Sequence, residues 1–296
     1  MDRNPAGTRI IGRFAPSPTG DLHFGSLVAA VASCFQARSR GGGWLVRMED
    51  IDPPREIPGS ADRILEDLGR FGLRHDGQVL YQSTRTHAYI DARDRLLAEG
   101  KAFWCGCSRA DLPRSGIYPG TCRDGLPPGK EPRAVRLRVD DTAVGFTDLI
   151  QGPIRESLSE TCGDFVIWRA DDLPAYQLAV VVDDAYQAVS EVVRGADLLD
   201  STCRQIHLQQ SLALPTPVYA HHPVAVDAKG RKLSKRLGSD PLATRKPAVA
   251  LAVALGFLGQ PCPAGLGLQD LLHWALDNWR LDRVPRRAQS GLPLLP

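Results

Sequence analysis

The sequence lacks the features that would assign it to a membrane, a repeat array or a strongly charged partner. No apolar run approaches the length of a membrane span, and the first residues lack the apolar core of a signal peptide. Internal repeats and low-complexity tracts are absent as well. The formal net charge is only +2, so any basic surface must be local. We therefore expect a globular protein in the cytoplasm that does not bind a membrane.

Cysteine is too unevenly placed for a disulfide framework. The chain has 7 cysteines, an odd number, and Cys105, Cys107 and Cys122 lie close together in the sequence. In a reducing compartment such a cluster favours metal binding, and a structural Zn²⁺ site needs four ligands. Asp111, Asp124 or a distant histidine would each serve as the fourth ligand. Free cysteines in the core are the alternative.

The segment from Arg13 to Ser26 carries the most specific pattern. It follows a short β-branched run and precedes apolar residues at helical spacing, which predicts a strand, a turn rich in proline and glycine, and a helix. Such a turn directs backbone N–H groups and the positive end of a helix toward one point, where anions bind. His23 can donate a hydrogen bond to a phosphate, and Gly25 leaves room for a nucleotide ring. A turn that merely caps an ordinary helix is the alternative.

A group of acids follows the next predicted strand, Trp44 to Met48. Arg47 lies near the end of this strand, and Glu49, Asp50 and Asp52 come directly after it. In open α/β sheets, ligands bind outside the carboxyl ends of the strands. These acids could therefore hold an amino group or Mg²⁺. A solvated acidic loop is the alternative.

The order of the predicted elements indicates a parallel α/β sheet with an insertion. Residues 101–174 are rich in glycine and proline between short alternating strands, so we expect them to form a small, mostly β insertion. After it, Tyr176 opens an apolar run, and Arg194 ends a predicted strand on the ligand side of the sheet. The alternatives are core packing for Tyr176 and an ion pair between Arg194 and Asp197 or Asp200.

A lysine-rich segment completes the set of candidate phosphate-binding groups. Lys232-Leu233-Ser234-Lys235 follows a glycine, and dense cations at this position would bind phosphate groups. A solvated basic surface loop is the alternative.

These motifs together resemble one known family. Arg-Phe-Ala-Pro-Ser-Pro-Thr-Gly followed by Leu-His-x-Gly is similar to the first signature of class I aminoacyl-tRNA synthetases of the glutamyl branch, and Lys-Leu-Ser-Lys is similar to the second. The resemblance implies a Rossmann-type parallel sheet, with His23 and Lys235 as catalytic residues. The residues that it assigns to ATP are His23, Gly25, Lys232, Ser234 and Lys235. The residues that it assigns to glutamate are Arg13, Phe14, Ala15, Pro16, Ser17, Glu49, Tyr176 and Arg194.

Within this branch, the cysteine pattern is similar to that of the glutamyl-queuosine tRNA(Asp) synthetase subfamily. That subfamily counts a tyrosine as a zinc ligand, which implies Tyr118 beside the three cysteines. Residues 237–296 are too few to build the anticodon-binding domain of a full glutamyl-tRNA synthetase. This shortness points to the same subfamily.

The resemblance implies an ATP-dependent ligase that activates L-glutamate and transfers it to queuosine in the anticodon loop of tRNA(Asp). It also implies a structural zinc ion, Mg²⁺ with the ATP, and a monomeric chain. Alternatives are a truncated or discriminating glutamyl-tRNA synthetase that charges a tRNA 3′ end, a small-molecule nucleotidyltransferase, and a zinc-containing RNA-binding module without activity.

The expected organisation has four segments. Residues 1–100 form the first half of the nucleotide-binding fold, and residues 101–174 form an inserted zinc subdomain that resembles an acceptor-binding one. Residues 175–240 form the second half with the lysine segment. Residues 241–296 form a short helical C-terminal region without an anticodon-binding domain.

Overall fold

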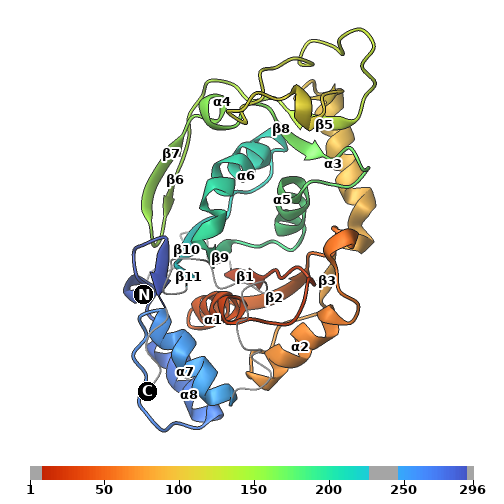
Figure 1. Ribbon diagram of the computed structural model, residues 1–296. Coiled ribbons are helices and arrows are strands. Elements are labelled where there is room, and N and C mark those ends of the chain that lie inside the picture. The colour runs from red at the N-terminus through yellow and green to blue at the C-terminus, as the bar shows by residue number, and fades with distance from the viewer. Residues whose placement is uncertain (1–8, 227–245, 292–296) are drawn as a thin grey trace.

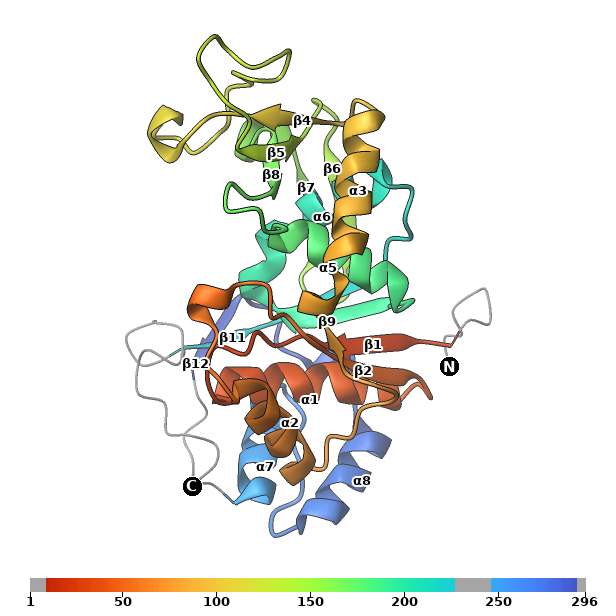
Figure 2. The same ribbon diagram turned by 90° about the vertical axis from the view of Figure 1, so that its right-hand side faces the viewer.

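A parallel sheet at the centre of the molecule separates two groups of helices (Figures 1 and 2). The computed structural model describes residues 9–226 and 246–291. The helices are α1 (Phe24–Arg38), α2 (Ser60–Arg70), α3 (Thr86–Ala98), α4 (Leu158–Thr161), α5 (Tyr176–Tyr186), α6 (Leu199–Ser211), α7 (Pro247–Phe257) and α8 (Leu268–Asn278). The strands are β1 (Ile11–Phe14), β2 (Gly43–Met48), β3 (Leu80–Tyr81), β4 (Ala102–Cys105), β5 (Ala134–Leu137), β6 (Val144–Asp148), β7 (Gly152–Glu156), β8 (Phe165–Trp168), β9 (Glu191–Gly195), β10 (Val218–His222), β11 (Val224–Val226) and β12 (Gln289–Gly291).

The central sheet is parallel, as the sequence predicts. Strand β1 pairs with β2, β2 pairs with β3, and β9 pairs with β10, all in parallel. Strand β9 lies beside β1, because the backbone N–H of Ser190 donates to the carbonyl of Ile11 (3.0 Å) and the N–H of Ile11 donates to the Ser190 hydroxyl (3.0 Å). The pairings β1-β2-β3 and β9-β10 therefore lie side by side as one surface with the strand order β3-β2-β1-β9-β10.

Helix α1 is buried between this sheet and the C-terminal helices. Figure 2 shows α1 on one face of the sheet with α7 and α8 beyond it, and α3, α5 and α6 on the other face. The sequence of α1 is apolar nearly all round, as expected for a helix that is covered on both sides. Its residues Leu27, Val28, Val31 and Phe35 are all buried. Among the described residues, no helix is both long and apolar enough to cross a membrane.

The segment between the two parts of the sheet is mostly β. Strands β4, β5 and β8 form an antiparallel sheet, and β6 and β7 form a hairpin. Figure 1 shows this hairpin running down the side of the molecule toward β10. At its turn, the N–H of Leu149 donates to the carbonyl of Tyr219 (2.9 Å), and Ile150 packs into the core cluster that contains α1 and α7. The hairpin therefore anchors the insertion to the central sheet.

Candidate active site

The turn after β1 is held in place by the first residue of α2. The hydroxyl of Ser60 donates to the carbonyl of Gly20 (2.7 Å) and accepts from its N–H (3.1 Å). Gly20 has a φ of 135°, which favours glycine. His23 then ends the turn as the N-cap of α1, and its Nδ1 accepts a hydrogen bond from the backbone N–H of Ser26 (3.2 Å). His23 therefore precedes the first helical turn, while Gly25 lies in it.

Glu49 follows the last residue of β2 and is tied to the same turn. Its backbone N–H donates to the carbonyl of Pro16 (2.9 Å). Burial raises the pKa of the Glu49 carboxyl to about 7, although the charges of Arg47 and Arg13 favour ionisation. A carboxyl with this pKa can exchange a proton near neutral pH, and it can hold an ammonium group when it is ionised.

Arg13 is oriented by Asp184 on α5, a helix on the face of the sheet opposite to α1. Asp184, on α5, accepts a hydrogen bond from Nε of Arg13 (3.2 Å) and forms an ion pair with Nη2 of Arg47 (2.8 Å). All three side chains are buried, and buried ions persist only when they are paired. Burial alone would raise the pKa of Asp184, but the two guanidinium groups hold it below its ordinary value. Among the described residues, none accepts a hydrogen bond from the Nη atoms of Arg13.

Arg194 reaches the same place from β9, where it is more tightly held. Its Nε donates to His221 (2.9 Å), its Nη1 to Gln205 (2.8 Å) and its Nη2 to Thr202 (2.8 Å). These partners, which lie on β10 and α6, were not the acids that the sequence suggested. Tyr176 opens α5 beside this arginine, and burial raises the pKa of its hydroxyl.

One cavity of about 960 Å³ collects these groups. Its volume is typical of a pocket for a nucleotide-sized ligand. The expected glutamate residues in its lining are Arg13, Phe14, Ala15, Pro16, Ser17, Glu49, Tyr176 and Arg194, and the expected ATP residues are His23 and Gly25. The carboxyl ends of β1, β2 and β9 therefore meet at one site. Lys232, Ser234 and Lys235 lie outside the described residues.

The acids after β2 do not all face this cavity. Glu49 lines it, whereas Asp50 accepts hydrogen bonds from the backbone N–H (2.9 Å) and the hydroxyl (2.6 Å) of Ser83. Asp52 forms an ion pair with Arg55. The structure thus gives Asp50 and Asp52 partners of their own within the protein.

The three clustered cysteines lie together in the insertion. Their sulfur atoms are within 4.8 Å of one another, and the Sγ atoms of Cys107 and Cys122 are 3.6 Å apart. All seven cysteines of the chain are free. The hydroxyl of Tyr118 lies 3.4 Å from Sγ of Cys105 and 4.0 Å from Sγ of Cys107, and it accepts a hydrogen bond from the N–H of Cys122 (2.9 Å). Four candidate ligand atoms therefore converge.

The other candidates for a fourth ligand point elsewhere. Asp111 accepts hydrogen bonds from Ser108 (2.8 Å) and Lys130 (2.9 Å). Asp124 is almost fully exposed and lies 3.9 Å from Arg138. Among the described residues, no histidine or acid joins the three cysteines in a possible metal-binding group.

Comparisons with known proteins agree with this geometry. A family model described as "tRNA synthetases class I (E and Q), catalytic domain" matches residues 9–115 and 126–244. The chain is 51% identical to the glutamyl-Q tRNA(Asp) synthetase of Aromatoleum aromaticum, over 97% of this chain and 94% of that protein. Enzymes of the same name from Geobacter sulfurreducens and Thiobacillus denitrificans are 54% and 52% identical, over 94% and 98% of this chain and 95% and 99% of those proteins. The chain belongs to the glutamyl-Q tRNA(Asp) synthetase family.

The structural comparison places this family member on a known fold. A glutamate tRNA ligase from Elizabethkingia meningosepticum, crystallised with its amino acid, superimposes with a TM-score of 0.83 at 23% identity, over 97% of this chain and 67% of that one. The class I synthetase fold with a parallel sheet is thereby confirmed. The prediction of a ligase of the aminoacyl-tRNA synthetase type is confirmed by the family membership.

Sequence reasoning missed the buried groups that support the cavity in this glutamyl-Q synthetase family member. It gave no role to Asp184 or Arg47, nor to His221 and Asp148. A usable signal was present for one of them, because Asp183 and Asp184 are adjacent acids in the apolar run of α5. Acids are almost never fully buried unless they are paired, so such a pair marks a buried ionic contact.

Proposed function

We propose that this protein activates L-glutamate with ATP and transfers the glutamyl group to queuosine in the anticodon loop of tRNA(Asp). The observation that carries the proposal is the single cavity with two arginines, a carboxyl and the N-terminus of α1. Glutamate has two carboxylates and one ammonium, which match these charges. The names of the relatives supply the tRNA and the modified base.

Glutamate recognition follows from the charges around the cavity. Arg13 and Arg194 each pair with one carboxylate, since guanidinium groups bind carboxylates strongly. Glu49 takes the ammonium group when it is ionised. Tyr176 and the backbone of the turn from Phe14 to Ser17 form the wall of the pocket.

The activation step needs positioning and charge stabilisation more than a protein nucleophile. A carboxylate oxygen of glutamate attacks the α-phosphorus of ATP in line, and pyrophosphate leaves. His23 and the N–H groups at the start of α1 stabilise the phosphate oxygens, and Gly25 leaves space for the nucleotide. Lys235, with Lys232 and Ser234, would contact the triphosphate, and Mg²⁺ would accompany it.

Zinc fits the cluster of Cys105, Cys107, Cys122 and Tyr118. Zn–S bonds of about 2.3 Å in a tetrahedron place ligand atoms about 3.8 Å apart, close to the 3.6 Å between Cys107 and Cys122. Arg136 supports this assignment, because its Nε donates to Sγ of Cys105 (3.3 Å) and would balance part of the negative charge of three thiolates. The ion would be structural and would hold a loop-rich part of the insertion in place.

Two assays test the proposed function. Purified protein should catalyse ATP–pyrophosphate exchange that depends on glutamate, and glutamine or aspartate should not replace it. Radioactive glutamate should then label tRNA(Asp) that contains queuosine, also after removal of its 3′-terminal adenosine. Labelling that needs the 3′ adenosine and ignores queuosine would favour the alternative, a glutamyl-tRNA synthetase that charges the 3′ end. The monomeric state and the cytoplasmic location stay predictions.

A further inference from the structure

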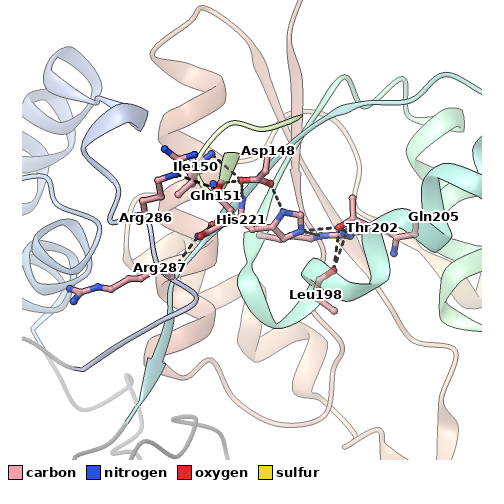
Figure 3. A network of polar contacts seen from close by, with 10 residues as sticks. Asp148, Ile150, Gln151, Leu198, Thr202, Gln205, His221, Arg286 and Arg287 are labelled. Carbon is pink, nitrogen blue, oxygen red and sulfur yellow. Dashed lines mark hydrogen bonds and ion pairs between the residues drawn. The ribbon is translucent and has the colours of Figure 1, made fainter. Parts of the chain in front are cut away.

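A buried polar network fixes one side of the Arg194 guanidinium, and Figure 3 labels its members Thr202, Gln205 and His221. Its Nη1 donates to Gln205 Oε1 (2.8 Å), and its Nη2 donates to Thr202 Oγ1 (2.8 Å) and the carbonyl of Leu198 (3.4 Å). Its Nε donates to Nε2 of His221 (2.9 Å). The protein thus contacts all three nitrogen atoms of the guanidinium, and only an N–H bond that these contacts do not use can face the cavity.

The contact with Arg194 determines which nitrogen of His221 carries the proton. Because Nε of Arg194 always carries a hydrogen, Nε2 of His221 must accept with its lone pair. The ring proton therefore lies on Nδ1, which donates to Oδ2 of Asp148 over 2.5 Å. His221 is fully buried, and burial together with the charge of Arg194 lowers its pKa although Asp148 acts in the opposite direction. The ring is neutral at pH 7.

Several hydrogen bonds hold the carboxylate of Asp148 in one orientation toward the His221 ring. It lies at the end of β6, and its Oδ1 accepts the backbone N–H groups of Ile150 (2.9 Å), Gln151 (2.8 Å) and His221 (3.1 Å). Figure 3 shows its carboxylate between the hairpin turn and the imidazole. Both oxygens are thus used as acceptors. Gln151 also ties the β6–β7 turn to β10, because its side-chain amide donates to the carbonyl of His221 (2.8 Å).

We propose that Asp148 and His221 are positioning residues for the glutamate site, and that the hairpin turn of the insertion thereby orients Arg194. Asp148 fixes the tautomer of His221, and the Nε2 lone pair of His221 fixes the rotation of the guanidinium. Neither residue contacts the substrate. The inference rests on the proposed role of Arg194 in binding glutamate. It implies that the insertion and the amino-acid pocket form one unit.

Replacing Asp148 with asparagine tests the tautomer directly. In Asp148→Asn, an NH₂ group must face either three backbone N–H groups or Nδ1 of His221. The second arrangement is tolerated only if the ring moves its proton to Nε2, which then opposes the Nε–H of Arg194. We expect the KM for glutamate to rise about 10- to 100-fold, as when a charged group loses a hydrogen bond. The KM for ATP should change less than about twofold, because the network does not touch the nucleotide side.

Two substitutions of His221 separate positioning from packing. In His221→Gln, the side-chain oxygen can reach the place of Nε2 and accept from Arg194. In His221→Asn, the amide can replace only Nδ1, so Arg194 loses its acceptor. We expect glutamine to restore a low KM for glutamate and asparagine to raise it. His207→Asn, in which a half-buried histidine on α6 loses its contact with the carbonyl of Arg138, is the matched control and should leave both KM values unchanged.

The ring tautomer provides a readout that needs no activity. Nitrogen-15 NMR of the unligated protein should place the proton of His221 on Nδ1, and in Asp148→Asn on Nε2. A wild-type ring with its proton on Nε2 would overturn the inference, whatever the substrate proves to be. Equal KM values for glutamate in the wild type, Asp148→Asn and His221→Asn would overturn it too. Absence of glutamate-dependent exchange in the wild type would instead contradict the proposed function.

Discussion

The charged residues that line the cavity are held in position by ion pairs and hydrogen bonds to residues that do not line it. Arg47 is fully buried and does not line the pocket, but it forms an ion pair with Asp184, which holds Nε of Arg13. Its Nη1 also donates to Gln187 (2.8 Å). This chain of contacts fixes Arg13 so that its Nη atoms can bind a carboxylate without rearrangement, and such preorganisation lowers the cost of binding.

Glu49 should give glutamate activation a dependence on pH. Its pKa is raised to about 7 by burial, so below that pH the carboxyl is neutral and loses its attraction for the ammonium group. We expect kcat/KM for glutamate, which reports the free enzyme, to fall about tenfold per pH unit below about 7 and to level off above it. Pyrophosphate exchange between pH 5.5 and 9, at roughly constant ionic strength, measures this profile.

A Glu49→Gln variant identifies the group that titrates. It should lower kcat/KM for glutamate by about 10- to 100-fold at pH 8, because the ammonium loses a charged partner. Its profile should be flat between pH 6 and 8. An unchanged acid limb in this variant would assign the titration to another group.

Arg13→Ala should abolish the activation of glutamate. The substitution leaves a substrate carboxylate without its cation in a buried site, and it leaves Asp184 with Arg47 as its remaining ion-pair partner. We expect at least a 100-fold loss of glutamate-dependent exchange, which corresponds to about 3 kcal/mol. The control is Arg63→Ala, which removes a half-buried arginine paired with Asp21 near the same turn. Near-normal exchange in Arg13→Ala would place the glutamate pocket elsewhere.

At the scale of elements, the loops around the cysteines have little apolar core of their own. The cluster of buried residues there consists of Phe103, Cys105, Tyr118 and Cys122. Burial and the neighbouring thiols raise the pKa of Cys107 to about 11, so without a metal the group stays protonated. Zinc would displace this proton and supply the stability that the short segments lack.

Cys107→Ser should therefore release zinc and loosen this part of the insertion. The metal content should fall from about one ion per chain to nearly none, and amides in β4 should exchange faster with solvent. Elemental analysis and hydrogen exchange measure both effects. Cys162→Ser is the matched control, because this cysteine lies in the same insertion but contacts backbone carbonyls. Unchanged zinc in Cys107→Ser would remove the zinc proposal.

The elements also indicate what the sequence can and cannot reveal. Elements with a clear local pattern were predicted well: the helix expected after the proline- and glycine-rich turn is α1, and the strand expected from Trp44 to Met48 is β2, Gly43–Met48. Strand β7 was missed, because Pro153 and Arg155 hide its alternation, and it forms only by pairing with β6. The cavity lining followed from local motifs. Its supports did not, since Asp148 and His221 meet only through the fold.

At the scale of the whole molecule, two apolar clusters share the central sheet. One contains α1, α7, α8 and the hairpin residue Ile150, and the other contains α3, α5, α6 and much of the insertion. Ile11 of β1 packs against the second cluster, while Val193 of β9 belongs to the first. Because β1 and β9 each contribute residues to both clusters, loss of one cluster removes support from the other.

Removal of one core side chain from α7, on the side of α1 away from the sheet, should therefore destabilise the whole described fold. Leu251 on α7 is fully buried in the first cluster, and Leu251→Ala should lower the free energy of unfolding by about 2–5 kcal/mol. Val249, on the same helix, is 51% exposed, and Val249→Ala should change it by less than about 1 kcal/mol. Urea unfolding measures both. If the clusters are coupled through the sheet, amide exchange in Leu251→Ala accelerates in α5 as well as in α7. Acceleration confined to α7 and α8 would mean that the C-terminal helices unfold independently of the glutamate site.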